Sequence, residues 1–347
     1  MADPGLDRHV SAPADSEGQR CPTGRASAME RRQFLIAGGL VPFAALLGCD
    51  GREPLLRVSG ITWVGYEPLF LARTLDLLPP DHIRLIESPS NTNSLMQLAS
   101  GEVEAATLTL DEFILARAGG IPVRVALVFD TSEGADVVMA RPGIDRLEHL
   151  AGRRVGVEET AAGALMLRKS LEAAGLEPED VTRVAVIGGG QVDAYRNGEI
   201  DAVISYEPFA SRLEALGATR LYDSSAFPGL IVDVLAVSER AIGRQPKALA
   251  ELVSAYFEAL AVVKSSPGRA HRLMAPRLGL SIDETARAYE GIVLLGVEDN
   301  HAWLDPPATR LTQATEAVAE IMQANALIDQ VPTLSDIATA RFLPEAP

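Results

Sequence analysis

The fold of this chain is indicated by a stretch that occurs twice, first as Gly101-Glu-Val-Glu-Ala-Ala106 and again, 97 residues later, as Gly198-Glu-Ile-Asp-Ala-Val203. Another pair of stretches, Arg57-Val-Ser-Gly60 and Arg154-Val-Gly-Val157, has the same separation. In the first pair we expect a helix to end at the glycine, which tolerates the left-handed backbone found after a helix C-terminus, and a short strand to follow. The common separation predicts two lobes of one architecture.

Around these repeats, short apolar segments alternate with amphipathic ones. The apolar segments predict strands at 55–61, 83–87, 105–108, 123–129, 136–140, 153–157, 181–186, 202–204 and 220–222, and one at 231–237 that crosses back to the first lobe. Between them we expect helices at 68–78, 92–100, 111–118, 162–174, 190–197 and 207–216, and then at 246–265, 267–277, 282–294 and 308–326. Strands that alternate with helices predict parallel β-α-β units and an α/β fold. The C-terminal helices should pack on the first lobe.

The N-terminal segment has the order of features found in an export signal. Residues 1–28 are interpreted as an extension before a start at Met29. Arg31 and Arg32 then precede an apolar run at 34–47, which is too short to span a bilayer as a helix and fits a signal peptide. Leu46-Leu-Gly-Cys49 resembles the lipobox of bacterial lipoproteins, and the arginine pair partly resembles the twin-arginine signal. We therefore expect residues 1–48 to be removed and Cys49 to carry the lipid anchor. The alternative is a buried helix that ends at an ordinary cysteine.

The composition excludes several classes of protein. With 47% hydrophobic residues, the chain is too apolar to be disordered. Its net charge of −16 argues against a nucleic-acid-binding surface, which needs lysine and arginine to neutralise phosphates. Two cysteines cannot form a disulfide scaffold, and the five histidines stand far apart, so we expect no metal site and no cofactor.

In open α/β sheets a ligand binds beyond the carboxyl ends of the strands, so the loops there hold the candidate residues. In the first lobe the candidates are Trp63, Tyr66, Glu67, Asn91 and Thr109. Trp63 and Tyr66 flank Gly65, an arrangement suited to stacking on a planar ligand, although plain packing is the alternative. Thr109 with Glu112 also has the spacing of a helix capping box.

The remaining candidates lie between the lobes and in the second lobe. They are Asp130, Ser132, Asp136, Glu159, Thr160, Tyr206 and Glu207. The first three belong to the segment that links the lobes, where a hinge is expected. Thr160 precedes small residues at a helix start, where a ligand can approach free N–H groups. For the acidic residues, capping of turns and helix ends is the alternative role.

Several of these segments, in this order and spacing, resemble one family. They are Trp63-Val-Gly-Tyr-Glu-Pro-Leu69, Asp130–Asp136, Leu150–Val157, Gly198–Ala202 and Tyr206–Pro208. They resemble the solute-binding proteins of ABC importers of the nitrate/sulfonate/taurine and thiamine-precursor type, and the resemblance covers residues 55–343. It implies a type II periplasmic-binding-protein fold, in which two Rossmann-like lobes are joined by two crossing strands. Lobe 1 would comprise residues 50–132 and 228–345, and lobe 2 residues 133–227.

The resemblance also implies a function without catalysis. A monomeric protein would capture a small molecule between its lobes and deliver it to the permease and ATPase subunits. The candidate loops contain acidic residues but no lysine or arginine, which favours a neutral or amine-bearing, aminopyrimidine-like ligand over a simple anion. Three alternatives remain open: a nitrate- or sulfonate-binding protein, a lipoprotein that signals to a membrane kinase or cyclase, and a pyrimidine-synthase-like enzyme. The enzyme is disfavoured because no cysteine follows Cys49.

Overall fold

The computed structural model describes residues 53–346. The predicted start at Met29, the signal segment and Cys49 lie outside the described residues. The described residues belong to one compact unit. Within the described range, no helix has both the length and the apolar character needed to cross a membrane.

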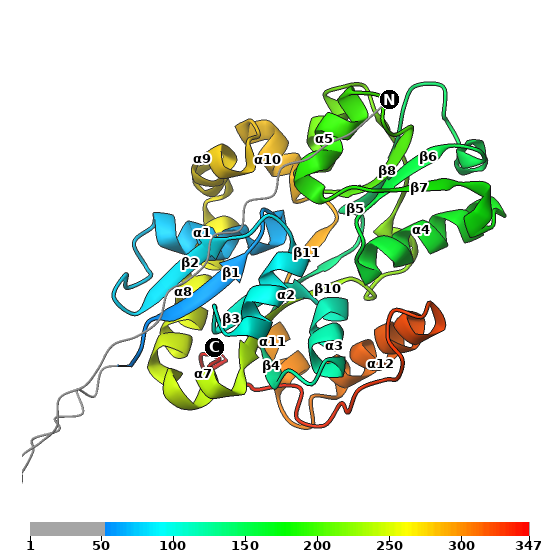
Figure 1. The fold of residues 1–347 in the computed structure, drawn as a ribbon. Helices are drawn as coiled ribbons and strands as arrows, with labels where there is room; N and C mark the ends of the chain where they lie inside the picture. Colours follow the sequence, from blue (N-terminus) through cyan, green and yellow to red (C-terminus); the bar gives the residue numbers. More distant parts are fainter. Residues whose placement is uncertain (1–52, 347) are drawn as a thin grey trace, which may run out of the picture. The chain divides into compact units, whose positions relative to one another are not determined.

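Lobe 1, as we define it here, is built on a six-stranded sheet (Figure 1). The strands in spatial order are β11 (Ile292–Leu294), β4 (Val123–Ser132), β10 (Val232–Ser238), β3 (Ala105–Thr109), β1 (Leu56–Gly60) and β2 (Ile83–Glu87). Strand β1 is parallel to β2 and β3, as the alternating pattern predicts, while β10 and β11 are antiparallel to their neighbours. The carboxyl ends of β1 and β3 therefore lie at the same edge of the sheet.

Lobe 2 is built on a five-stranded sheet. Its strands in spatial order are β7 (Thr182–Ala185), β6 (Arg154–Val157), β8 (Ala202–Tyr206), β5 (Asp136–Ala140) and β9 (Thr219–Asp223). Strand β6 is parallel to β7 and β8, and β5 is antiparallel to β8 and β9. The order β9-β5-β8-β6-β7 repeats the order β4-β10-β3-β1-β2 of lobe 1, which confirms the two lobes of one architecture.

The repeated stretches hold equivalent positions in the two sheets. In lobe 1, Arg57 on β1 pairs with Glu104 just before β3, with Nη2 2.6 Å from Oε1. In lobe 2, Arg154 on β6 pairs with Asp201 just before β8, with Nη2 2.8 Å from Oδ1. Each acid also accepts a hydrogen bond from the backbone N–H of its arginine, at 2.9 Å in both lobes. Each repeat therefore contains the same arginine–acid ion pair between two neighbouring parallel strands, which we call the strand clamp.

The chain passes from one lobe to the other at two crossings. β4 ends at Ser132 and β5 begins at Asp136, and β9 ends at Asp223 before β10 begins at Val232. The two crossing segments are tied together by the hydroxyls of Ser132 and Ser224, whose oxygens lie 2.8 Å apart.

The helices cover both sheets, and the C-terminal ones pack on lobe 1. Lobe 1 carries α1 (Glu67–Thr74), α2 (Asn91–Ser100), α3 (Leu110–Ala118), α7 (Glu239–Arg244), α8 (Pro246–Ser265), α9 (Pro267–Leu278), α10 (Ile282–Ala288), α11 (Val297–Leu304) and α12 (Thr309–Ala324). Lobe 2 carries α4 (Ala161–Ala174), α5 (Gly188–Arg196) and α6 (Phe209–Glu214). Helix α8 packs against α1, and α12 packs against α3. Separate buried apolar clusters lie on the two faces of each sheet.

Some predicted boundaries were wrong. The helix expected at 282–294 ends at Ala288, because the chain turns at Gly291 and then forms β11 against β4. Gly291 has a φ of +87°, and a Cβ there would lie 2.7 Å from the carbonyl carbon of Gly134. Helices α7 and α11 were not predicted.

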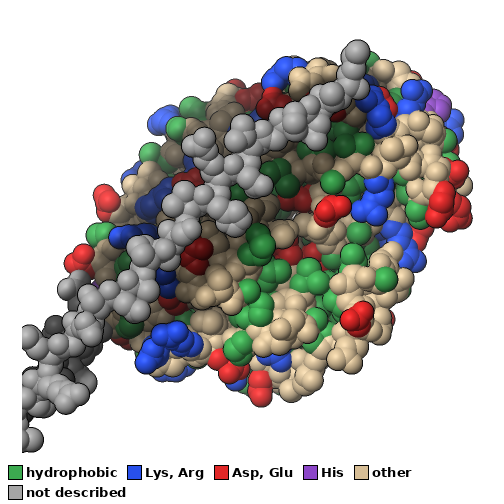
Figure 2. Space-filling model, viewed as in Figure 1, with side chains coloured by type: hydrophobic (Ala, Val, Ile, Leu, Met, Phe, Trp, Pro, Cys, Tyr) green, Lys and Arg blue, Asp and Glu red, His purple; other side chains and the backbone are tan. Residues whose placement is uncertain are grey.

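The side chains on the face shown in Figure 2 mix basic with acidic groups, without a continuous basic patch.

Candidate functional site

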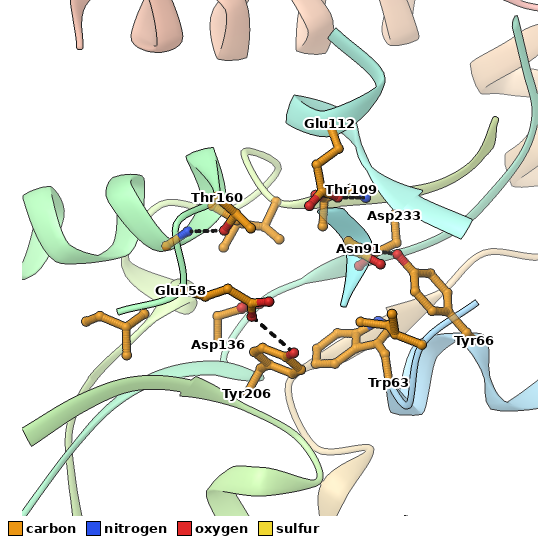
Figure 3. Close-up of a pocket in the computed structure, with 15 residues that line it drawn as sticks. Trp63, Tyr66, Asn91, Thr109, Glu112, Asp136, Glu158, Thr160, Tyr206 and Asp233 are labelled. Atoms are coloured by element: carbon orange, nitrogen blue, oxygen red, sulfur yellow. Dashed lines mark hydrogen bonds between the residues drawn. The ribbon is translucent and has the colours of Figure 1, made fainter. Parts of the chain in front are cut away.

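A cavity lies between the two lobes (Figure 3). The volume that the centres of water molecules can occupy in this cavity is about 50 Å³. The residues that line it are Ile61, Trp63, Tyr66, Asn91, Thr109, Glu112, Asp136, Glu158, Thr160, Ala162, Gly163, Ile204, Tyr206, Ile231 and Asp233. They come from the carboxyl ends of β1, β3, β6 and β8, from the first turns of α2, α3 and α4, and from the two crossings. This is the edge at which ligands bind in open α/β sheets.

Trp63 is placed by a close approach of the backbone. Its indole Nε1 donates to Oδ2 of Asp130 at 3.4 Å. A Cβ at Gly65 would lie 2.0 Å from this carboxylate oxygen and 2.4 Å from the indole nitrogen. Only glycine therefore fits beside the Trp63 indole and the Asp130 carboxylate.

Three contacts cross the cleft and hold the lobes together. The rings of Trp63 and Tyr206 meet edge to face, with centroids 5.7 Å apart. The first turn of α4 donates the N–H of Ala162 to Oδ2 of Asp111 at 3.1 Å. On the other side, Arg212 of α6 donates to the carbonyl oxygen of Leu278 at the end of α9. The lobes are thus in contact around the cavity.

The hydrogen-bond donors of the cavity wall are largely used within the protein. Tyr66 donates its hydroxyl to Asp233, and Tyr206 donates its hydroxyl to Oε2 of Glu158 at 3.2 Å. The N–H and the hydroxyl of Thr109 both donate to Oε2 of Glu112, at 3.1 and 2.7 Å.

Three hydrogen-bond acceptors of the cavity wall, by contrast, have no donor in the described part of the chain. Oδ1 of Asn91, Oε1 of Glu112 and Oδ2 of Asp136 are buried and have no hydrogen-bond partner in the described part of the chain. The three side chains are only 8%, 1% and 9% exposed. A buried acceptor without a donor is unfavourable, so N–H or O–H groups that enter the cavity, from water or from a ligand, would stabilise these three atoms.

Burial also raises the pKa values of the acidic side chains that line the cavity. Burial raises the pKa of Asp136 to about 6, with a further rise from the Asp111 carboxylate. It raises the pKa of Glu158 to about 7, since desolvation outweighs the hydrogen bond from Tyr206. The pKa values of Glu112 and Asp233 are raised well above the ordinary range by burial, and secondarily by the adjoining acids Asp111 and Asp130. Among the residues that line the cavity there is no lysine or arginine.

Seven of the candidate residues line the cavity: Trp63, Tyr66, Asn91, Thr109, Asp136, Thr160 and Tyr206. Two others support it from behind. Asp130 accepts from the indole of Trp63, and Ser132 accepts from the N–H of Asp136 at 3.2 Å.

Three candidates do not reach the cavity. Glu67 is buried in an ion pair with Arg277, whose guanidinium also stacks on Phe70 at 3.4 Å from the ring centroid. Glu207 is buried in an ion pair with Arg220, with Oε1 2.5 Å from Nη2. Both acids are therefore held in ion pairs with arginines, a role that the sequence analysis did not predict.

Glu159 is exposed, and its neighbour Glu158 takes the place in the cavity that was expected for it. Side chains alternate direction along extended backbone, so an error of one residue moves a side chain to the opposite face.

Sequence reasoning missed three carboxylates of the wall, those of Glu112, Glu158 and Asp233. Glu112 was assigned only a capping role, although its second oxygen faces the cavity. Asp233 lies near the start of β10, and no loop signal marks it. Its position follows from the register of β10 with β4, which pairs it with Asp130. Among the described residues, no group of three or more histidine, cysteine or acidic side chains is arranged to hold a metal ion.

Comparisons with known proteins agree with the fold. The model of the NMT1-like family matches residues 51–278, more than half of the chain. The taurine-binding periplasmic protein of Escherichia coli (strain K12) is 24% identical over 128 residues. That match covers 37% of this chain and 40% of the relative, so the chain spans less than half the length of the curated relative it matches.

Solved structures extend the likeness to most of the chain. The alkanesulfonate-binding protein SsuA from Xanthomonas axonopodis pv. citri, bound to MOPS, has a TM-score of 0.67 at 18% identity, and the match covers 82% of this chain and 97% of that one. The nitrate-binding protein NrtA from Synechocystis PCC 6803 has a TM-score of 0.59 at 13% identity, with 81% and 92% covered. The desulfurization enzyme DSZB shares the fold as well, with a TM-score of 0.61 at 19% identity and 83% and 97% covered. The type II periplasmic-binding-protein fold and the resemblance to solute-binding proteins are confirmed.

Proposed function

Because the chain belongs to the NMT1-like family, we propose that it is the extracytoplasmic solute-binding subunit of an ABC importer and that its ligand is an amine-bearing small molecule. The ligand enters between the lobes, contacts both, and favours the closed state that docks on the permease, which an ATPase drives. We propose that lobe 1 comprises residues 50–132 and 228–345, and that lobe 2 comprises residues 133–227.

The observation that carries the ligand class is the excess of acceptors in the cavity. Four carboxylates line it, from Glu112, Asp136, Glu158 and Asp233, and no cationic side chain does. A sulfonate or nitrate in this space would be repelled by the ionised acids and would add further acceptors to unpartnered ones. An amine supplies both the N–H donors and the compensating charge. Trp63 and Tyr206 add aromatic surface for a planar or cationic group.

A thermal-shift screen tests the ligand class. The panel contains primary amines, amidines and aminopyrimidines on one side, and nitrate, taurine and alkanesulfonates on the other. We expect saturable stabilisation by members of the first group only, since a ligand that binds the folded state alone raises the melting temperature. Saturable stabilisation by nitrate or a sulfonate, with no response to any amine, would refute the proposal.

A second candidate, a sulfonate- or nitrate-binding protein, is favoured by one observation besides the names of the relatives. A pocket beside the cavity, which shares Ile61 and Tyr206 with it, is lined by Arg212 and Arg277. Arg277 is neutralised by Glu67, whereas Arg212 has no carboxylate within 4.0 Å in the described part of the chain. If an anion stabilises the protein, Arg212→Ala should abolish that response. An unchanged response would exclude this pocket.

We further propose that the protein is a lipoprotein anchored through Cys49 on the outer side of the membrane, and that it reaches this side by an export signal of the twin-arginine type. The support is the sequence order of the basic pair, apolar run and Leu46-Leu-Gly-Cys49. Cys49→Ser should move the protein from the membrane fraction to the soluble extracytoplasmic fraction. A variant that stays membrane-bound would contradict the anchor.

A further inference from the structure

Acidic groups of opposite lobes meet in the closed cleft. Glu112 belongs to the first turn of α3 in lobe 1, whereas Asp136 belongs to β5 and Glu158 directly follows β6 in lobe 2 (Figure 3). The contact between Asp111 and the first turn of α4 brings these elements together.

The meeting groups repel each other when they are ionised. The carboxylate of Asp111 disfavours the ionised forms of Asp136 and Glu158 across the cleft, and that of Glu158 disfavours the ionised form of Glu112. No lysine or arginine lines the cavity to offset this repulsion. Closure therefore concentrates negative charge in a space from which water is largely removed.

One unpartnered oxygen faces the cavity from each lobe. Oε1 of Glu112 and Oδ2 of Asp136 are both buried without a donor, and the side chains are 99% and 91% buried. The hydroxyls of Tyr66 and Tyr206 donate to Asp233 and Glu158, and that of Thr109 donates to the other oxygen of Glu112. A donor inside the cavity would therefore satisfy both oxygens.

Building on the amine-binding function proposed above, we propose that closure is gated by charge: the lobes close when a cation with N–H donors bridges Glu112 of lobe 1 and Asp136 of lobe 2. The cation offsets the repulsion between the lobes and satisfies both orphaned oxygens. A quaternary ammonium ion has charge but no N–H donor, so it leaves the two oxygens unpartnered. An uncharged ligand supplies donors but leaves the repulsion in place.

Protons can replace the cation, since a protonated carboxyl is neutral and carries a donor. The titratable groups that face the cavity, or lie directly behind its wall, are Asp111 and Glu112 on α3, Asp130 on β4, Asp136 on β5, Glu158 after β6, Asp233 on β10, and the tyrosines Tyr66 and Tyr206. The ligand-free protein should therefore be open at pH 8 and closed at pH 5.

The decisive experiment needs no ligand. Small-angle scattering at pH 8 compares the ligand-free wild type with the double variant Glu112→Gln/Asp136→Asn, which removes one charge from each lobe and leaves two amide groups that can donate. The control, Glu159→Gln/Glu179→Gln, removes two exposed charges outside the cavity. We expect the wild type and the control to have the larger radius of gyration at pH 8 and to contract at pH 5. The cavity variant should be contracted at both pH values.

Equal radii for the wild type and the cavity variant at pH 8, or no contraction of the wild type at pH 5, would overturn the inference. The pH titration of the wild type remains informative if the variant does not fold.

A titration separates this inference from the proposed function. The panel member that best stabilises the wild type is titrated into both variants by calorimetry. The cavity variant should bind it at least about 100-fold more weakly, because two charge-assisted hydrogen bonds are lost. Binding that is equally tight in the cavity variant would overturn the inference and leave the amine-binding function standing. If no amine stabilises the wild type, the proposed function fails, while the scattering result still decides whether closure is gated by charge.

Discussion

The substitution Asp136→Asn should remove a pH-dependent destabilisation of the ligand-free protein. Asp136 is 9% exposed, and burial raises its pKa from 3.8 to about 6. A raised pKa means that the folded protein holds this proton more tightly than the unfolded chain. Between pH 4 and pH 6 the folded state therefore binds more protons, and its stability falls as the pH rises.

The size of the effect follows from the shift of this pKa. A rise from 3.8 to about 6 corresponds to about 3 kcal/mol, which is fully present above pH 7 and lost below about pH 3, where both states are protonated. Opening of the lobes hydrates the carboxylate, so about 3 kcal/mol is an upper limit. The asparagine variant has no charge at this position at any pH. It should be more stable than the wild type at pH 8, and the difference should shrink to about 0.5 kcal/mol near pH 4.

Urea unfolding at intervals from pH 4 to pH 8 measures this difference. Glu159→Gln serves as the matched control, because Glu159 is exposed and lies outside the cavity. The control should stay within about 0.5 kcal/mol of the wild type throughout. A difference between the wild type and Asp136→Asn that does not change with pH, or that grows toward low pH, would refute the reasoning.

Three further substitutions test the frame around the cavity. Gly65→Ala should weaken ligand binding and destabilise the fold by about 1–3 kcal/mol, since the new methyl overlaps the Asp130 carboxylate; calorimetry and urea unfolding measure both effects. Arg277→Met should cost about 3–5 kcal/mol by leaving Glu67 buried without its partner, and an unfolding midpoint equal to the wild type would contradict this. Arg154→Ala should leave the midpoint of urea unfolding nearly unchanged, because its side chain is 44% exposed, and a clear loss would show that the strand clamp is structural.

The sequence predicts the fold well where the signals are local. The repeats around Gly101 and Gly198 are explained by the paired clamps of Arg57 with Glu104 and of Arg154 with Asp201. Buried strands flanked by turn residues were also found at close to their observed bounds. The segment at 282–294 failed because its last residues form a strand through pairing with β4, and a contact so distant in the sequence leaves no periodic signal.

The site was predicted less completely, for reasons that differ between residues. The loops after parallel strands are predictable, and they supplied Trp63, Thr109 and Tyr206. The direction of a side chain within such a loop is not, which is why Glu158 rather than Glu159 faces the cavity. Acids that pair with distant arginines, such as Glu207, have the same local sequence signature as acids that face a ligand.

The central claim is that the cleft holds a cation with N–H donors. The most direct test is to identify the molecule that co-purifies with the protein from the cells that naturally produce it. Native mass spectrometry of the gently purified protein gives the mass of one bound molecule, and fragmentation of that molecule identifies it. We expect an N–H-bearing cation that is retained by Glu159→Gln/Glu179→Gln and lost from Glu112→Gln/Asp136→Asn. A bound sulfonate or nitrate, retained in both variants, would contradict the claim.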